Sequence, residues 1–202
     1  MHKIFDNTKL LVLDIMGVIL TNGSLIKRGL YPIYKEKYSY SLVKGLYSNV
    51  RHSTEGDTSL WKGLNEKNYN NARRNFLDKY KVDYEYETFK RKILEKDIKL
   101  GILSNMPKEW ADYLVKRLDL NKDYSFTIFS GYVGLKKPDI DIYEYLLKQS
   151  NYSPNEIVFI DDKLRNLAPA SKLGIKTVHF KRKDDEFDFK PDLTVGSFSD
   201  MF

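Results

Sequence analysis

The chain has 202 residues, 42% of them hydrophobic, which is enough to bury one substantial core with a small second lobe beside it. It contains no cysteine, which excludes a disulfide framework and thiolate metal sites and suits a reducing compartment. The net charge of +6 comes from 34 basic and 28 acidic residues spread along the chain, without the aromatic and basic alternation typical of nucleic-acid-binding strands.

The N-terminal segment, residues 1–6, lacks the apolar core of a signal peptide. The longest apolar stretch, residues 10–20, is too short to span a bilayer and carries Asp14. We therefore expect a cytoplasmic protein with no membrane segment and no nucleic-acid partner. The oligomeric state is not determined by any feature of the sequence.

The first predicted strand covers residues 9–14, and Gly17 after it permits a sharp turn. The pattern then breaks, because residues 23–96 are rich in Lys, Tyr, Asn and Glu and hold no convincing apolar strand. Ser24 is a candidate N-cap, and the stretch at residues 51–63 is expected to be irregular. Helices are predicted at residues 24–37, 42–47, 69–79 and 86–94.

Strands and helices alternate from residue 97 onward, as is typical of a parallel sheet with crossover helices. The predicted strands cover residues 99–104, 126–130, 157–161 and 176–180, with a weak edge strand at 193–195. The predicted helices cover residues 108–118, 140–149 and 164–172. The sequence thus predicts an α/β fold. We expect a Rossmann-like, three-layer parallel sheet core of residues 1–20 and 97–202, with a helical cap domain of residues 21–96 inserted into it.

Four polar motifs follow or close predicted strands. The first is Asp14, and the second is the pair Ser104-Asn105. The third is Lys137 before Pro138, and the last is the acidic pair Asp161-Asp162. Because the carboxyl ends of parallel strands form one ligand crevice, we expect the four motifs to lie together in space.

These residue types have a joint chemical use. A carboxylate can attack phosphorus to form an aspartyl-phosphate, but a cation must offset its repulsion with the phosphate. Asp14 and Asp162 offer the oxygen ligands that magnesium prefers. Ser104 could hold phosphoryl oxygens, and Lys137 could neutralise developing charge and orient Asp14.

In this order and context the motifs resemble the four motifs of the haloacid dehalogenase-like hydrolase superfamily, over residues 10–178, with a helical cap between the first and second motifs. The resemblance implies that Asp14 is the nucleophile and that Lys137 is the basic catalytic residue. It implies that Ser104 binds the substrate phosphate, with Asn105 as a further substrate-binding candidate. Asn105 and Asn166 are also candidate helix caps.

The resemblance also implies a bound Mg²⁺ ion between Asp14 and Asp162. The backbone carbonyl of Met16 would be a further ligand, whatever the side chain there. Asp161 would bind the metal directly or through water. The expected partner is a small phosphorylated substrate, such as a sugar phosphate or a nucleotide.

One position departs from the family pattern. Phosphatases of this family place a second aspartate two residues after the nucleophile, where it protonates the leaving group, but here that residue is Met16. A thioether cannot supply this help, which is typically worth about 10²–10⁴-fold in rate. Three accounts remain open: similarity to glucose-1-phosphate phosphatase-like members with a non-acidic residue there, a substitute acid from the cap such as His52, or a non-catalytic module that binds a phospho-ligand or a protein.

Two other branches of the family also lack this aspartate. Dehalogenases work without magnesium and do not keep a paired acidic motif, so Asp161-Asp162 argues against dehalogenation. Phosphonate cleavage would need a Schiff-base lysine in the cap, and the lysines there carry no distinguishing context. The expected activity is therefore magnesium-dependent hydrolysis of a small phosphomonoester.

Overall fold

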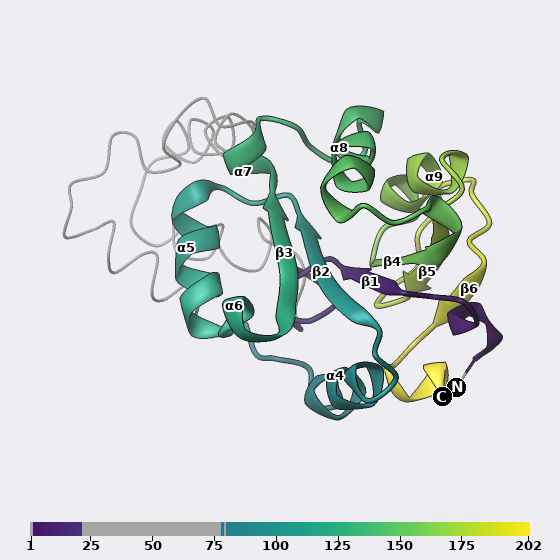
Figure 1. Ribbon diagram of the computed structural model, residues 1–202, viewed down its shortest axis with the longest axis horizontal. Coiled ribbons are helices and arrows are strands. Elements are labelled where there is room, and N and C mark those ends of the chain that lie inside the picture. The colour runs from purple at the N-terminus through teal and green to yellow at the C-terminus, as the bar shows by residue number, and fades with distance from the viewer. Residues whose placement is uncertain (1, 22–77, 79) are drawn as a thin grey trace.

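The computed structural model describes residues 2–21, 78 and 80–202, and in these residues a six-stranded parallel sheet is the central feature (Figure 1). The strand order is β3-β2-β1-β4-β5-β6, and every neighbouring pair is parallel. The strands are β1 Leu10–Leu13, β2 Lys99–Ser104, β3 Tyr124–Phe129, β4 Ile157–Asp161, β5 Lys176–Phe180 and β6 Leu193–Val195. The predicted α/β fold class is confirmed.

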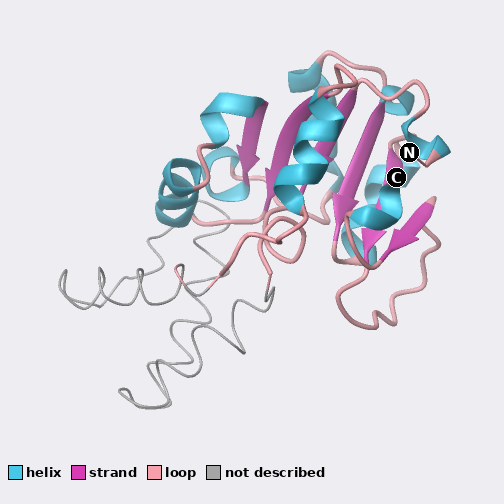
Figure 2. Ribbon diagram, turned by 90° about the horizontal axis from the view of Figure 1, so that it is seen from below, coloured by secondary structure: helices cyan, strands magenta, loops and turns pink. Residues whose placement is uncertain are grey.

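Helices cover both faces of the sheet, as Figure 2 shows. The α-helices are α4 Tyr86–Leu94, α5 Lys108–Arg117, α6 Leu120–Asp123, α7 Ser130–Val133, α8 Ile140–Ser150 and α9 Leu164–Lys172. Short 3₁₀ helices are η1 Lys3–Phe5, η3 Pro154–Glu156 and η4 Ser199–Met201. Among the described helices, none combines the length and apolar character needed to cross a bilayer.

The alternation of side chains along β1 explains the three layers. Leu11 and Leu13 point into one hydrophobic cluster, which also contains Trp110 of α5. Leu10 and Val12 point into the other, which contains residues of α8 and α9. Successive residues of a strand face opposite sides, and all four are fully buried, so β1 is a central strand covered on both faces.

Most elements begin and end where the sequence predicts. Strands β2, β4, β5 and β6 and helices α4 and α9 have the expected bounds. Strand β3 begins two residues earlier than expected, and Ser130 opens α7 instead of closing the strand. Helices α6 and α7 were not predicted, because four residues are too few to show a helical period.

The predicted cap lies largely outside the described residues, as do its expected helices at residues 24–37, 42–47 and 69–79 and the irregular stretch at 51–63. Helix α4, which falls at the end of the expected cap range, packs against β2. Its Phe89 and Ile93 are buried in the same cluster as Leu11 of β1, and the rings of Phe89 and Phe198 lie 4.7 Å apart. Helix α4 therefore contributes to the layer that covers one face of the sheet.

The chain segments on either side of the undescribed range lie side by side. The amide of Thr21 donates to the carbonyl of Lys81 (2.8 Å), and the amide of Asp83 donates to the carbonyl of Ile19 (2.9 Å). Leu20 and Val82 form an antiparallel bridge. The loop after β1 is thus joined directly to the segment that leads into α4.

Candidate active site

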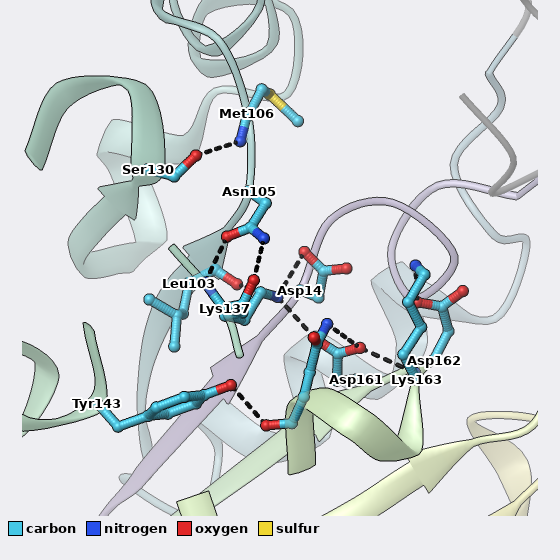
Figure 3. Close-up of polar contacts among 11 residues, drawn as sticks. Asp14, Leu103, Asn105, Met106, Ser130, Lys137, Tyr143, Asp161, Asp162 and Lys163 are labelled. Atoms are coloured by element: carbon cyan, nitrogen blue, oxygen red, sulfur yellow. Dashed lines mark hydrogen bonds and ion pairs between the residues drawn. The ribbon is translucent and has the colours of Figure 1, made fainter. Parts of the chain in front are cut away.

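Three carboxylates converge at the carboxyl ends of β1 and β4 (Figure 3). One oxygen each of Asp14, Asp161 and Asp162 lies within 4.8 Å of the others, and all three residues are buried. Strands β1 and β4 are neighbours in register, and the amide of Asp14 donates to the carbonyl of Ile160 (3.0 Å). Sheet topology alone therefore brings the first and fourth motifs together.

Lys137 lies between two of these carboxylates. Its Nζ is 2.6 Å from Oδ2 of Asp161 and 3.1 Å from Oδ1 of Asp14, and it donates to the carbonyl of Leu103 at 2.8 Å. Burial alone would lower the pKa of Lys137, but the charges of Asp14 and Asp161 outweigh it and hold that pKa above its ordinary value. Lys137 is therefore a fixed ammonium group beside Asp14.

Asn105 holds the segment that carries Lys137. Its Nδ2 donates to the carbonyl of Lys137 (2.7 Å), and its Oδ1 accepts from the amide of Lys137 (2.8 Å). This pair of hydrogen bonds links the second motif to the third. Both polar atoms of the Asn105 side chain are engaged in this way, and its predicted contact with substrate stays a prediction.

Ser104, the last residue of β2, presents an unsatisfied hydroxyl. It is 1% exposed, and its Oγ has no hydrogen-bond partner among the described residues. A buried polar group without a partner costs about 1–3 kcal/mol. Ser104 follows Leu103, whose carbonyl accepts from Lys137, so the hydroxyl belongs to the same sheet edge. A phosphoryl oxygen bound there would satisfy it.

The two acidic residues of the fourth motif have different surroundings. Oδ1 of Asp161 accepts from the amide of Lys163 (2.9 Å), Oδ2 accepts from Lys137, and Nδ2 of Asn166 lies 3.0 Å from both oxygens. Asp162 has one such partner among the described side chains, Nζ of Lys163, at 2.9 Å from Oδ1. Asp162 is therefore the better placed of the two for direct contact with a metal ion.

Burial sets the acidity of Asp162. It raises the pKa of this carboxyl to about 6, against the opposing charge of Lys163 and with the help of the charges of Asp161 and Asp14. A divalent cation at the cluster would favour the ionised form. The ionisation of Asp162 therefore depends on whether a cation is bound at the cluster.

The loop after β1 passes close to Asp162. Gly17 has φ +93°, and a Cβ there would lie 2.5 Å from Oδ2 of Asp162, so both conformation and space require glycine. Met16 and Leu20 form a parallel bridge. In this bridge the amide of Leu20 donates to the carbonyl of Ile15, and the amide of Gly17 donates to the carbonyl of Leu20. The carbonyl of Met16 is therefore not part of this bridge.

Two contributors to the site were not predicted as such. The sequence signal for Lys163 is its place directly after two aspartates, where its ammonium can form an ion pair with the neighbouring carboxylate. Asn166, for which the sequence indicates a polar site residue or a helix cap, lies inside α9 and donates from Nδ2 to Asp161, and the hydroxyl of Tyr143 donates to its carbonyl at 2.5 Å. His52, the candidate substitute acid, lies outside the described residues.

The parallel α/β sheet carries buried carboxylates and a lysine at its carboxyl edge, where ligands bind in open sheets of this kind. The family model of haloacid dehalogenase-like hydrolases matches residues 8–174. The chain belongs to this family of hydrolases, and the resemblance seen in its four motifs is confirmed.

Similar curated proteins include phosphatases. Glyceraldehyde 3-phosphate phosphatase of Methanocaldococcus jannaschii is 30% identical over 110 residues, which are 52% of this chain and 47% of that protein. Drimenol cyclase drtB of Aspergillus calidoustus is 29% identical over 113 residues, which are 52% of this chain and 20% of that protein. The chain therefore spans less than half the length of these two relatives.

Solved structures share the fold across nearly the whole chain. A HAD phosphatase from Thermococcus onnurineus has a TM-score of 0.73 and 21% identity, covering 96% of this chain and 95% of its own. A HAD family enzyme from Bacteroides thetaiotaomicron, in complex with magnesium and inorganic phosphate, has a TM-score of 0.71 and 18% identity, covering 89% and 97%. An L-2-haloacid dehalogenase from Xanthobacter autotrophicus has a TM-score of 0.69 and 14% identity, covering 96% of both chains.

Proposed function

We propose that this hydrolase is a magnesium-dependent phosphatase of small phosphomonoesters, with Asp14 as the nucleophile. One observation carries the proposal: buried Asp14 lies beside the fixed ammonium of Lys137 and within one cluster with Asp161 and Asp162. The same fold serves dehalogenases, so the fold alone does not select the reaction. The paired acids favour phosphate chemistry, because a carboxylate pair is suited to a hard cation.

The residues present fit a magnesium ion. The donor set consists of carboxylate oxygens, which magnesium prefers, and Gly17 leaves room for Asp162 at the loop. Asp14, Asp162 and the carbonyl of Met16 would hold the ion, with Asp161 reaching it through water because its oxygens are already bonded. When bound, magnesium would offset the repulsion between Asp14 and the substrate phosphate.

The other residues act on the reacting groups. Lys137 holds Asp14 in place and neutralises charge on the phosphoryl group, while Ser104 donates its free hydroxyl to a phosphoryl oxygen. A carboxylate oxygen of Asp14 forms a bond to phosphorus as the bond between phosphorus and the alcohol oxygen breaks, and the alcohol oxygen takes a proton from water because Met16 has none to donate. Water then attacks the phosphorus of the aspartyl-phosphate, the bond between phosphorus and the Asp14 oxygen breaks, and the proton of the water leaves to solvent, which releases inorganic phosphate and restores the Asp14 carboxylate.

The substrate we propose is a small phosphorylated metabolite such as a sugar phosphate or a nucleotide, in the cytoplasm and without a nucleic-acid partner. The similarity to a glyceraldehyde 3-phosphate phosphatase supports the sugar phosphate. Met16 favours a second candidate, a non-catalytic module that binds a phospho-ligand or a protein, because it removes the usual proton donor. Activity measurements separate the two.

The first prediction is that replacing Asp14 with Asn abolishes magnesium-dependent phosphate release. An amide cannot attack phosphorus usefully, so the rate should fall by at least about 10³-fold. The measurement is phosphate release from a panel of phosphomonoesters, with magnesium and with a chelator. No release from any substrate by the native protein, together with measurable magnesium or phosphate binding, would support the binding module instead.

A further inference from the structure

A lysine occupies one oxygen of the proposed metal ligand Asp162. The side chains of Lys163 and Asp162 lie beside each other (Figure 3), with Nζ of Lys163 2.9 Å from Oδ1 of Asp162. The Asp162 side chain is only 5% exposed. The backbone of Lys163 is anchored at the same time, because its amide donates to Asp161. Lys163 therefore places a positive charge directly on a carboxylate that a magnesium ion would need.

The two lysines of the site differ in their freedom to move. Lys137 has a side chain that is 1% exposed, and its Nζ contacts Asp14, Asp161 and the carbonyl of Leu103. The Lys163 side chain is 32% exposed, and its Nζ contacts Asp162 alone among the described residues. A lysine has a flexible stem and a strongly hydrated ammonium, so Lys163 can exchange Asp162 for water. Lys137 is held in place.

Charge explains why a displaceable cation belongs here. Three buried carboxylates face two ammonium groups, which leaves a net charge of −1 in the cluster without metal. Without Lys163 the net charge of the cluster would be −2, and like charges in a buried site repel each other strongly. With a divalent ion added, by contrast, Lys163 and the ion repel each other.

We propose that Lys163 is a resident counter-ion of Asp162, which stabilises the metal-free site and competes with magnesium for that carboxylate. The proposal rests on the magnesium site of the proposed function. It predicts two effects of opposite sign when the charge is removed: the metal-free protein becomes less stable, and magnesium binds more tightly. If Lys163 had only a structural role, its replacement would lower both the stability of the metal-free protein and the affinity for magnesium.

The test is calorimetric titration of magnesium into the metal-stripped full chain, comparing native protein with Lys163→Met. The dissociation constant should fall about 5- to 10-fold in the variant, because one unit of nearby positive charge is removed from a buried site. Lys172→Met is the matched control, since Lys172 is an exposed residue in the last turn of α9 and its removal changes the net charge equally. Lys163→Arg, which keeps the charge, should bind magnesium close to the native affinity.

Thermal unfolding in a chelator provides the second readout. Lys163→Met should unfold about 2–4 °C below native protein and below Lys172→Met, the shift expected for a modest loss of stability in a chain of this size. Saturating magnesium should remove that difference. Lys163→Gln, which keeps a polar side chain, should show the same pattern and serves if Lys163→Met does not fold.

The outcomes separate the two proposals. If native protein binds magnesium, Asp162→Asn abolishes the binding and Lys163→Met leaves the affinity unchanged or weaker, the role of Lys163 is overturned while the metal site stands. If neither native protein nor Lys163→Met binds magnesium, the proposed metal site is overturned, and the proposed competition by Lys163 is overturned with it. Binding by Lys163→Met but not by native protein would support strong competition.

Discussion

Met16 determines which substrates we expect the proposed reaction to favour. Met16 is buried in the loop that follows Asp14, at the position where phosphatases of this family carry a proton donor. A leaving group of low pKa departs without a proton, whereas an alkyl alcohol needs one. We therefore expect the native protein to prefer anomeric or aryl phosphates to alkyl phosphates.

Replacing Met16 with Asp tests this expectation. The substitution keeps the backbone carbonyl and adds a carboxyl group, so turnover of alkyl phosphates should rise by about tenfold or more, with a smaller effect on aryl phosphates. The measurement is kcat for a matched pair of alkyl and aryl substrates. Equal native rates for both substrates, unchanged in the variant, would point to another proton donor such as His52.

At the scale of elements, Arg182 connects the loop after β1 with two distant segments. Its Nε donates to the carbonyl of Gly17 (3.0 Å), and its Nη2 donates to the carbonyl of Val18 (3.1 Å) and to Oδ2 of Asp83 (2.6 Å). The guanidinium also stacks on Phe180, with Cζ 4.3 Å from the ring centroid. One side chain after β5 thus fixes the loop that carries Met16 and the segment that leads into α4.

Replacing Arg182 with Met should lower the free energy of unfolding by about 2–4 kcal/mol, because it leaves the buried carboxylate of Asp83 without its ion pair. The measurement is urea unfolding at neutral pH in a chelator. Arg91→Met is the matched control: its ion pair with Glu95 is 4.0 Å long on the exposed surface of α4, so its loss should cost less than about 0.5 kcal/mol. A similar small change for both variants would show that the Arg182 contacts do not stabilise the loop.

At the scale of the whole molecule, we expect the carboxylate cluster to couple folding to pH and, through the proposed magnesium site, to metal. Burial raises the pKa of Asp162 to about 6, above its ordinary value of 3.8. In the metal-free protein, the stability contributed by this group is therefore fully present below pH 3.8 and is lost as the pH rises through about 6. Magnesium needs the ionised carboxylate, so it should stabilise the protein most where the metal-free protein has lost this contribution.

We predict that magnesium raises the unfolding temperature at about pH 7.5 and that the increase shrinks as the pH falls through about 6. At a concentration of 100 times its dissociation constant, a ligand of the native state stabilises it by about 2.7 kcal/mol. The measurement is thermal unfolding with saturating magnesium and with a chelator across this pH range. Asp162→Asn should show no increase at any pH. A magnesium effect in native protein that does not vary with pH would contradict the role of Asp162.

Within the described residues, the sequence by itself determined the strands and the longer helices, because side-chain alternation and helical periodicity are local properties that burial enforces. The bounds of β2, β4 and α9 follow from these patterns. The sequence also predicted that Asp14, Lys137 and the acidic pair lie together, since each follows or ends a predicted strand and strand ends in a parallel sheet meet at one edge.

Only the tertiary structure decided how these residues divide their tasks. Asp161 is bonded to Lys137 from 24 positions away, and Gly17 is held by Arg182 from 165 positions away. Contacts between residues so far apart in the sequence depend on how the elements pack, and a local sequence pattern does not contain that information. For the same reason the sequence indicates the two aspartates, but only the structure shows that Asp161 is bonded to Lys137, Lys163 and Asn166, whereas Asp162 is paired with the partly exposed side chain of Lys163.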